Sequence, residues 1–163
     1  MGVESFGVEY VYTDSAQLAA KLRAARVIEK IEKEGSQVQT IHYFSGGVEI
    51  EFFDPIGRPR SHMTSREGVL YREKRIAEMN GDVVLTNYKG ERLETEQLFW
   101  DDQKDSIYTT KFIRIETPDK VITGSRGLRS NTSFTAYTIY GIRGEIEAED
   151  EPAPRKPGVG GQP

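Results

Sequence analysis

A single sequence frame decides the fold: Ile122-Thr123-Gly124-Ser125-Arg126-Gly127-Leu128. The frame has seven positions. An apolar residue stands at position 1 and a small residue at position 3. Position 6 is Gly or an apolar residue, and position 7 is apolar. Three other stretches fit this frame: Leu22-Arg23-Ala24-Ala25-Arg26-Val27-Ile28, Met63-Thr64-Ser65-Arg66-Glu67-Gly68-Val69 and Leu93-Glu94-Thr95-Glu96-Gln97-Leu98-Phe99. The first residues are separated by 41 (22 to 63), 30 (63 to 93) and 29 (93 to 122) positions. A period of about 30 residues predicts stacked hairpins that bury their apolar faces on their neighbours.

The frame also predicts a change of direction inside each copy. Its first apolar residue and its small residue are two positions apart, so they lie on one face of a strand. The later apolar residue lies at an odd offset of five positions, which would place it on the opposite face. A bend or bulge between them restores a common interior. We therefore expect strands that turn a corner between two facing sheets.

The rest of the chain supports an all-β domain. Val48-Glu49-Ile50-Glu51-Phe52 alternates apolar and polar residues, which is typical of a half-buried strand. Further strands are expected over residues 83–85, 111–115 and 134–139. Asp54-Pro55-Ile56-Gly57 has the residues of a type I turn, and turn-forming residues also separate the other strands.

Two segments allow more than one interpretation. Residues 16–34 are rich in Ala, Leu, Lys, Arg and Glu, with Leu18, Leu22 and Ala25 at helical spacing. Asn80-Gly81 is a strong hairpin signal, although the repeat places it just inside a strand. In both places we predict strand, because the repeat requires it.

Composition sets the outer limits. A chain of 163 residues suits one domain, and its net charge of -4 gives no general attraction for nucleic acid. The absence of Cys excludes disulfides and thiolate metal sites. We expect a short lead over residues 1–6, a β-domain over residues 7–143 and a disordered acidic, Pro- and Gly-rich tail over residues 144–163. The opening residues carry no signal-peptide pattern, and we expect that a native N-terminal anchor or signal has been removed.

Catalytic and metal-binding patterns are weak. His42 and His62 have no closely spaced His companion, so neither predicts a zinc site. Glu94 and Glu96 would lie about 7 Å apart on one strand face, a separation like that of inverting glycosidases. They alternate with Leu93 and Thr95, however, which predicts a solvated outer face. We predict no enzyme, no metal and no cofactor, and keep a carbohydrate-active enzyme as a rival hypothesis.

The apolar positions of the strands predict an interior between the two sheets. Its members are Ile50, Phe52, Met63, Leu85, Leu93, Trp100, Ile113, Ile115, Ile122 and Leu128. They suit either a plain core or a groove for a lipid chain. Burying one methylene contributes about 0.8 kcal/mol, whereas an exposed ion pair contributes about 0–1 kcal/mol. A groove of this kind would therefore hold its ligand mainly through acyl chains.

The chain resembles the LptC family, the periplasmic bridging component of the lipopolysaccharide-export machinery. The resemblance runs over about residues 7–146 and is strongest in three successive stretches, residues 81–87, 90–100 and 118–131. It implies a twisted, open-ended antiparallel β-jellyroll, as in LptA. It also implies that the chain accepts lipopolysaccharide from the inner-membrane ABC transporter and passes it to LptA, with the acyl chains inside the jellyroll. Family members carry an N-terminal membrane anchor.

An open jellyroll leaves unpaired strand edges, which suit strand addition by a partner. The expected edge residues are Val8, Tyr10 and Tyr12 on the N-terminal side and Phe134, Ala136, Tyr137 and Ile139 on the C-terminal side. The resemblance assigns the first edge to the LptB-LptF-LptG transporter and the second to LptA. It also adds Gly124, which matches a familiar glycine near the C-terminal edge. The alternative is an envelope adaptor with a closed core that binds proteins and no lipid.

Overall fold

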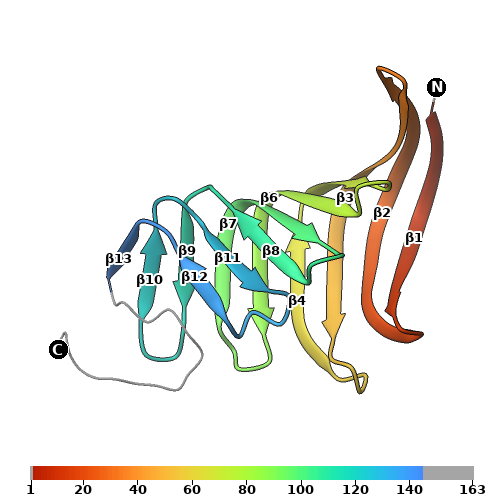
Figure 1. The fold of residues 1–163 in the computed structure, drawn as a ribbon. Coiled ribbons are helices and arrows are strands. Elements are labelled where there is room, and N and C mark those ends of the chain that lie inside the picture. Colours follow the sequence, from red (N-terminus) through yellow and green to blue (C-terminus); the bar gives the residue numbers. More distant parts are fainter. Residues whose placement is uncertain (1, 145–163) are drawn as a thin grey trace.

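The computed structural model describes residues 2–144, and the regular elements of this range are all strands of one 13-stranded antiparallel sheet (Figure 1). The strands are β1 (Gly2–Asp14), β2 (Gln17–Glu34), β3 (Gln37–Phe53), β4 (Pro59–Ser65), β5 (Glu67–Tyr71), β6 (Ile76–Asn87), β7 (Arg92–Asp101), β8 (Ser106–Thr109), β9 (Ile113–Glu116), β10 (Val121–Gly124), β11 (Leu128–Asn131), β12 (Tyr137–Ile139) and β13 (Ile142–Gly144). The predicted all-β, jellyroll-like fold is confirmed. No helix within residues 2–144 is long and apolar enough to cross a bilayer.

Two expected boundaries meet the limits of this description. β1 begins at Gly2, so residues 2–6 of the expected lead belong to a strand. The expected tail lies outside the described residues, except for Gly144, which ends β13.

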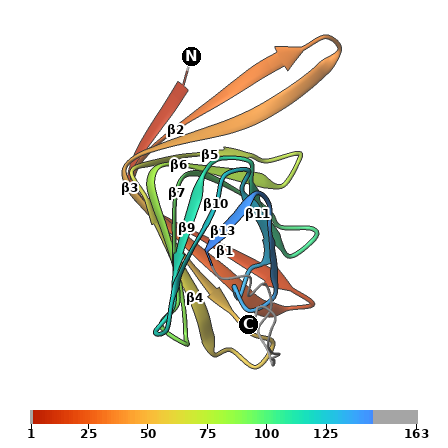
Figure 2. The ribbon, with the colours of Figure 1, turned by 90° about the vertical axis from the view of Figure 1, so that its left-hand side faces the viewer.

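The sheet folds over on itself into two layers because its long strands change partners half-way. β3 pairs with β5 through residues 41–44 and with β4 through residues 48–53. β6 likewise pairs with β5 through residues 76–80 and with β4 through residues 84–87. β7 continues the pattern with β8 and β9. We name the two halves the β4 layer and the β5 layer; Figure 2 shows them meeting along one side of the molecule.

The β5 layer contains the first part of β1, the second part of β2 and the first part of β3, followed by β5, the first part of β6, the second part of β7, β8, β11 and β12. The β4 layer contains the remaining parts of those long strands with β4, β9, β10 and β13. Beyond β5, the hairpin formed by the ends of β2 and β3 splays away from the body (Figure 2).

Each copy of the sequence frame turns the predicted corner. In β2 the pairing with β3 shifts register between Ala24 and Arg26, so Leu22 and Val27 are both buried in spite of their odd offset. In β7 a shift opposite Gly81 and Asp82 does the same for Leu93 and Leu98. A β-bulge inserts one unpaired residue and thereby reverses the side-chain alternation.

The other two copies turn the corner between separate strands. Arg66 separates β4 from β5, and residues 125–127 separate β10 from β11. Gly127 has a φ of 89°, and a Cβ there would lie 1.9 Å from the carbonyl oxygen of Thr109. This turn therefore needs glycine for both its conformation and its space.

Both ambiguous segments are strands, as predicted. Residues 17–34 form β2, which is hydrogen-bonded on both sides by β1 and β3. Asn80 and Gly81 lie inside β6, where the positive φ values of Gly81 and Asp82 form the corner of the strand. Asn-Gly thus indicates residues that adopt positive φ, and here these residues form a bulge within a strand instead of a hairpin turn.

Gly124 occupies a tight position inside β10. A Cβ on this residue would lie 2.6 Å from Cγ2 of Ile139 and 3.1 Å from Cγ1 of Ile113. Its strand pairs with β9 on one side and β13 on the other, so Gly124 is interior to the β4 layer and does not lie on a free edge. The expected assignment of this glycine to the partner edge is therefore corrected: it allows the two layers to approach each other.

Gly124→Val should lower the free energy of unfolding by about 1–3 kcal/mol, because the added methyl groups overpack this contact. Thr123→Val places a side chain of the same shape one residue earlier, on the outward parity, and should change stability by less than about 0.5 kcal/mol. Urea titration followed by circular dichroism measures both. Equal stability of the two variants would contradict the role given to Gly124.

Candidate functional site

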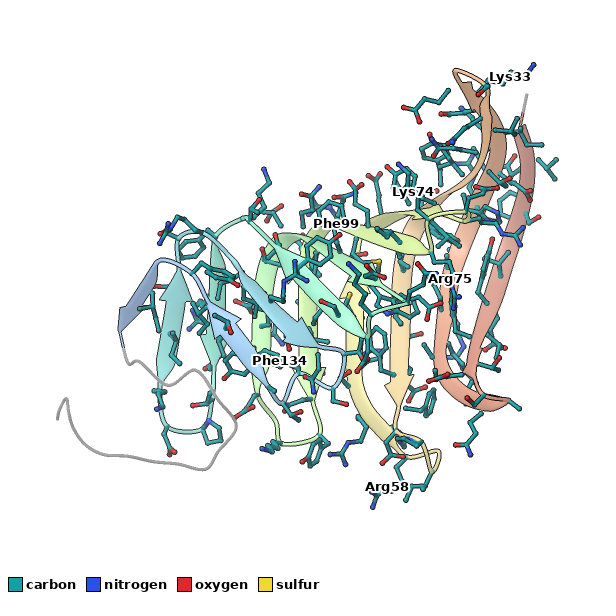
Figure 3. The ribbon with its side chains drawn as sticks, in the orientation of Figure 1. Lys33, Arg58, Lys74, Arg75, Phe99 and Phe134 are labelled. Atoms are coloured by element: carbon teal, nitrogen blue, oxygen red, sulfur yellow. The ribbon has the colours of Figure 1, made fainter. Side chains whose placement is uncertain are left out.

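The two layers do not close at the end of the molecule formed by β1. A cavity of about 490 Å³ lies between residues 9–13 of β1 and the β5 layer. A second cavity of about 540 Å³ lies beside it, between the ends of β1, β2 and β3 and the turn after β7. Thr13, Arg75, Trp100 and Asp102 line both cavities. We name the two cavities together the mouth; Figure 3 shows Arg75 near this end.

Tyr10 connects the layers across the mouth. Its hydroxyl forms a short hydrogen bond with Nδ1 of His42, although Tyr10 lies in the β4 layer and His42 in the β5 layer. The Tyr10 ring also packs edge-on against Phe44, with 5.4 Å between the ring centroids. The two layers are therefore joined at this point by contacts between side chains.

A second connection is aromatic. Trp100 of β7 packs edge-on against Tyr12 at 4.8 Å and against Phe52 at 5.0 Å between ring centroids. Tyr12 and Phe52 come from the β4 layer, so Trp100 of the β5 layer is held between them. Trp100 belongs both to the lining of the mouth and to the buried core. The apolar interior and the mouth are consequently continuous through this ring.

Two polar atoms beside the mouth are buried without a hydrogen-bond partner, namely the Tyr12 hydroxyl and Nε2 of His42. The nearest carboxylate oxygen to Nε2, from Glu29, is 4.0 Å away, which is beyond hydrogen-bond distance. Burial raises the pKa of Tyr12, and the neighbouring Asp102 raises it further. Burial lowers the pKa of His42, against the opposite effect of Glu29. Both groups are therefore neutral at neutral pH.

Charged side chains of both signs line the rim of the mouth. Arg75 donates from Nε to Oδ2 of Asp102 at 3.0 Å, so this guanidinium is held in place between the two cavities. Arg72 lines the first cavity, and its charge acts on Tyr10, Tyr12 and His42. The mouth thus joins an aromatic wall to a rim of mixed charge, where carboxylates also stand: Glu9, Asp14, Asp54 and Asp105. Its aromatic wall suits an apolar part of a ligand.

All ten residues predicted to face inward do so. The interior positions are at most 3% exposed and lie together in one core cluster: Ile50, Phe52, Met63, Leu85, Leu93, Trp100, Ile113, Ile115, Ile122 and Leu128. Their contact with a lipid stays a prediction. In the ligand-free chain they pack against one another, and Phe52 and Trp100 also reach the mouth.

The expected N-terminal edge is a sheet edge. Val8, Tyr10 and Tyr12 lie on β1, which pairs with β2 alone, while their side chains pack on the core. Consecutive residues 9–13, whose side chains point alternately to the two faces of the sheet, all line the first cavity. This cavity therefore runs along the unpaired edge of β1.

The C-terminal edge is shorter than expected. Tyr137 and Ile139 lie on β12, which pairs with β11 alone. Ala136 precedes this strand as an isolated bridge residue: its carbonyl accepts from the N–H of Asn131 at 3.2 Å, and its own N–H donates to Oδ1 of Asn131 at 3.2 Å. Phe134 has a φ of 56° and is fully buried in the body of the jellyroll, stacked on Tyr137 (Figure 3). The expected strand from Phe134 to Ile139 therefore starts at Tyr137, because Phe134 anchors the turn in the core.

The groups considered for catalysis lie on the outer surface or in the core. Glu94 accepts hydrogen bonds from Arg92 at 2.8 Å and from Arg114 at 3.5 Å, as expected for a solvated face. His62 lies 2.7 Å from Glu49 on the outer side of the β4 layer, whereas His42 is buried. Within the described range, no group of three or more His, Asp or Glu residues is placed to hold a metal ion.

Comparison with protein families matches residues 8–147 to the LptC model, described as "Lipopolysaccharide-assembly, LptC-related". The chain belongs to the LptC family. The protein is therefore involved in lipopolysaccharide transport and belongs to the cell envelope. No curated protein matches the chain. The matched range covers both layers and every residue of the mouth named above.

Sequence patterns missed the polar part of the mouth. His42, Arg72, Arg75 and Asp102 come from β3 and from the turns after β5 and β7, and no common motif joins them. They meet because β1 folds under the β5 layer, which periodicity along the chain does not reveal.

Stability should depend on His42 as the pH falls. Its folded pKa is below the ordinary 6.5, so below 6.5 the unfolded chain binds a proton that the folded chain does not. The free energy of unfolding should therefore decrease as the pH falls from about 8 to about 5. Glu29, Glu73 and Arg72 surround the ring, so the same series should be run in high salt to screen their charges.

His42→Gln should make this pH dependence shallower, because an amide does not titrate. Thermal denaturation of both proteins across the range measures it. An unchanged slope in the variant would show that His42 titrates alike in both states.

Proposed function

We propose that this chain is a non-enzymatic bridge that accepts lipopolysaccharide from the inner-membrane LptB-LptF-LptG transporter and passes it to LptA. It acts in the periplasm, at the inner membrane. The observation that carries the proposal is the mouth, where an aromatic wall continues into the apolar interior. Acyl chains enter there and follow the inward-facing residues toward β12 and β13.

The energies favour entry of a chain between the layers. The layers are connected at the mouth by one hydrogen bond and a few ring contacts, each contributing about 0.5–1.5 kcal/mol. Ten buried methylenes would contribute roughly 8 kcal/mol. An acyl chain can therefore displace these contacts, while the hydrogen-bonded corner keeps the two layers joined.

The splayed hairpin supports a protein partner at the N-terminal end. Ile31 and Val38 of this hairpin are 68% and 51% exposed, and Val3 of the neighbouring β1 is 66% exposed. Their register with His42 puts them on the face that continues the interior. Three exposed apolar side chains on this face, beside an unpaired strand, suit a second jellyroll, which would extend the lipid path. We assign the transporter to this end.

The lipid path is tested by photo-crosslinking. A crosslinker at Trp100 or Leu85 should capture lipopolysaccharide, because both side chains face inward. At Thr86, the next residue along β6, it should not, because the neighbouring side chain points outward. Equal capture at Leu85 and Thr86, with the fold intact by circular dichroism, would refute an interior path.

Strand addition by LptA is tested at β12. In an antiparallel pair, hydrogen-bonded and non-hydrogen-bonded residue pairs alternate. The N–H of Tyr140 donates to Gly127, and the N–H of Asn131 donates to Ala136. Ile139 therefore lies in a non-hydrogen-bonded pair, and its N–H points away from β11. Ile139→Pro removes this donor and should reduce LptA capture about fivefold, with lipopolysaccharide binding largely retained. Ile139→Val keeps the donor and is the matched control. Equal capture of LptA by the two variants would show that LptA does not add its strand to β12.

A lipid-free adaptor is the second candidate, and the packed core favours it. The ten interior residues already fill the space between the layers. Such an adaptor would bind LptA through β12 in the same way, but no inward position would crosslink to lipopolysaccharide.

A further inference from the structure

The first cavity of the mouth combines aromatic walls with two buried polar atoms that have no partner. The Tyr12 hydroxyl and Nε2 of His42 are both fully buried, and both residues line this cavity. The side chain of His42 is 7% exposed. Buried polar groups in folded proteins are nearly always hydrogen-bonded, so two exceptions beside one cavity call for an explanation.

The two atoms present defined hydrogen-bonding roles. When the Tyr10 hydroxyl donates to Nδ1 of His42, the remaining proton of the neutral imidazole is on Nε2, which is then a donor. The Tyr12 hydroxyl can donate and accept. A ligand group that accepts from an imidazole or exchanges a hydrogen bond with a phenol fits either position, and an alcohol hydroxyl does both.

Aromatic rings pack around both residues and make a charged ligand group costly at this depth. Tyr12 packs on Trp100, and His42 packs near Tyr10 and Phe44. Moving an anion into such an aromatic site costs far more than moving a neutral hydroxyl. Phosphate groups therefore stay at the rim with Arg72, and the inner ligand group is neutral.

We propose that Tyr12 and His42 form a polar subsite for hydroxylated acyl chains, the class of chain that lipid A carries near its sugar backbone. The inference rests on the proposed function and adds a selectivity to it. A plain fatty acyl chain leaves both atoms without partners, whereas a β-hydroxyacyl chain supplies a hydroxyl next to its polar end. The site thereby distinguishes lipid A acyl chains from those of ordinary phospholipids.

The experiment uses Trp100, the one Trp of the chain, as the reporter, since it lines the cavity and touches Tyr12. Trp emission is titrated with β-hydroxymyristate, with myristate and with purified lipopolysaccharide, on the full chain. The wild type should bind β-hydroxymyristate about fivefold more tightly than myristate. Tyr12→Phe should lower that preference to about twofold or less, and Tyr12→Phe with His42→Phe should abolish it.

Tyr88→Phe is the matched control, because Tyr88 is exposed in the turn between β6 and β7. This variant should keep the wild-type preference. Tyr12→Phe also removes an unsatisfied hydroxyl, so the ligand-free variant should melt about 2–4 °C higher than the wild type. A purely structural role of the Tyr12 hydroxyl predicts the opposite shift.

The outcomes separate the two proposals. Equal binding of the two fatty acids by the wild type, with lipopolysaccharide still bound, would overturn the subsite and leave the proposed function standing. A wild-type preference that Tyr12→Phe leaves intact would overturn the subsite in the same way. Failure of all three ligands to bind would overturn the proposed function, and the subsite with it.

Discussion

The structure depends on one constraint: a single sheet must bury one face on itself. Strict alternation along a strand keeps that face on one side, so a strand that crosses from one layer to the other has to break the alternation once. β2 does this with a bulge after Ala24, and β6 with Gly81 and Asp82. These breaks align across neighbouring strands, so the corner is hydrogen-bonded from β1 to β7, and the layers are joined by covalent strands instead of side-chain packing alone.

The same constraint explains which features could be predicted from the sequence. Leu22 and Val27 are separated by an odd number of positions, as are Leu93 and Leu98, and this spacing predicts the corner of the strand. It also correctly predicts strand over residues 17–34, although the composition of this segment favours helix. Parity along each strand also identifies the inward residues. Contacts between layers are different, because they depend on how far each strand extends past the corner. The bond between Tyr10 and His42, the ion pair of Arg75 with Asp102 and the buried turn at Phe134 therefore have no signal in the sequence pattern.

The two ends of the jellyroll differ because their strands differ in length. β1, β2 and β3 have 13, 18 and 17 residues, and their tips extend past β5 with nothing opposite them. β10 to β13 have three or four residues each, and Gly124 lets them pack closely. One end is consequently wide and closed by side chains, whereas the other is narrow and ends in two short edges, β12 and β13.

This asymmetry gives a direction to any ligand that moves through the interior. At the wide end, closure relies on Tyr10, Tyr12 and Trp100, and it leaves two polar atoms unsatisfied, each at a cost of about 1–3 kcal/mol. A closed state that carries such a cost is easier to open than one in which every polar atom is hydrogen-bonded. A ligand that forms hydrogen bonds with these two atoms recovers that free energy on binding. At the narrow end, no buried side-chain atom of the described residues lacks a partner, so in the proposed transfer opening there relies on a partner that supplies new main-chain bonds. Under the proposed function, the ligand itself would then drive entry, and the protein that adds its strand would drive exit.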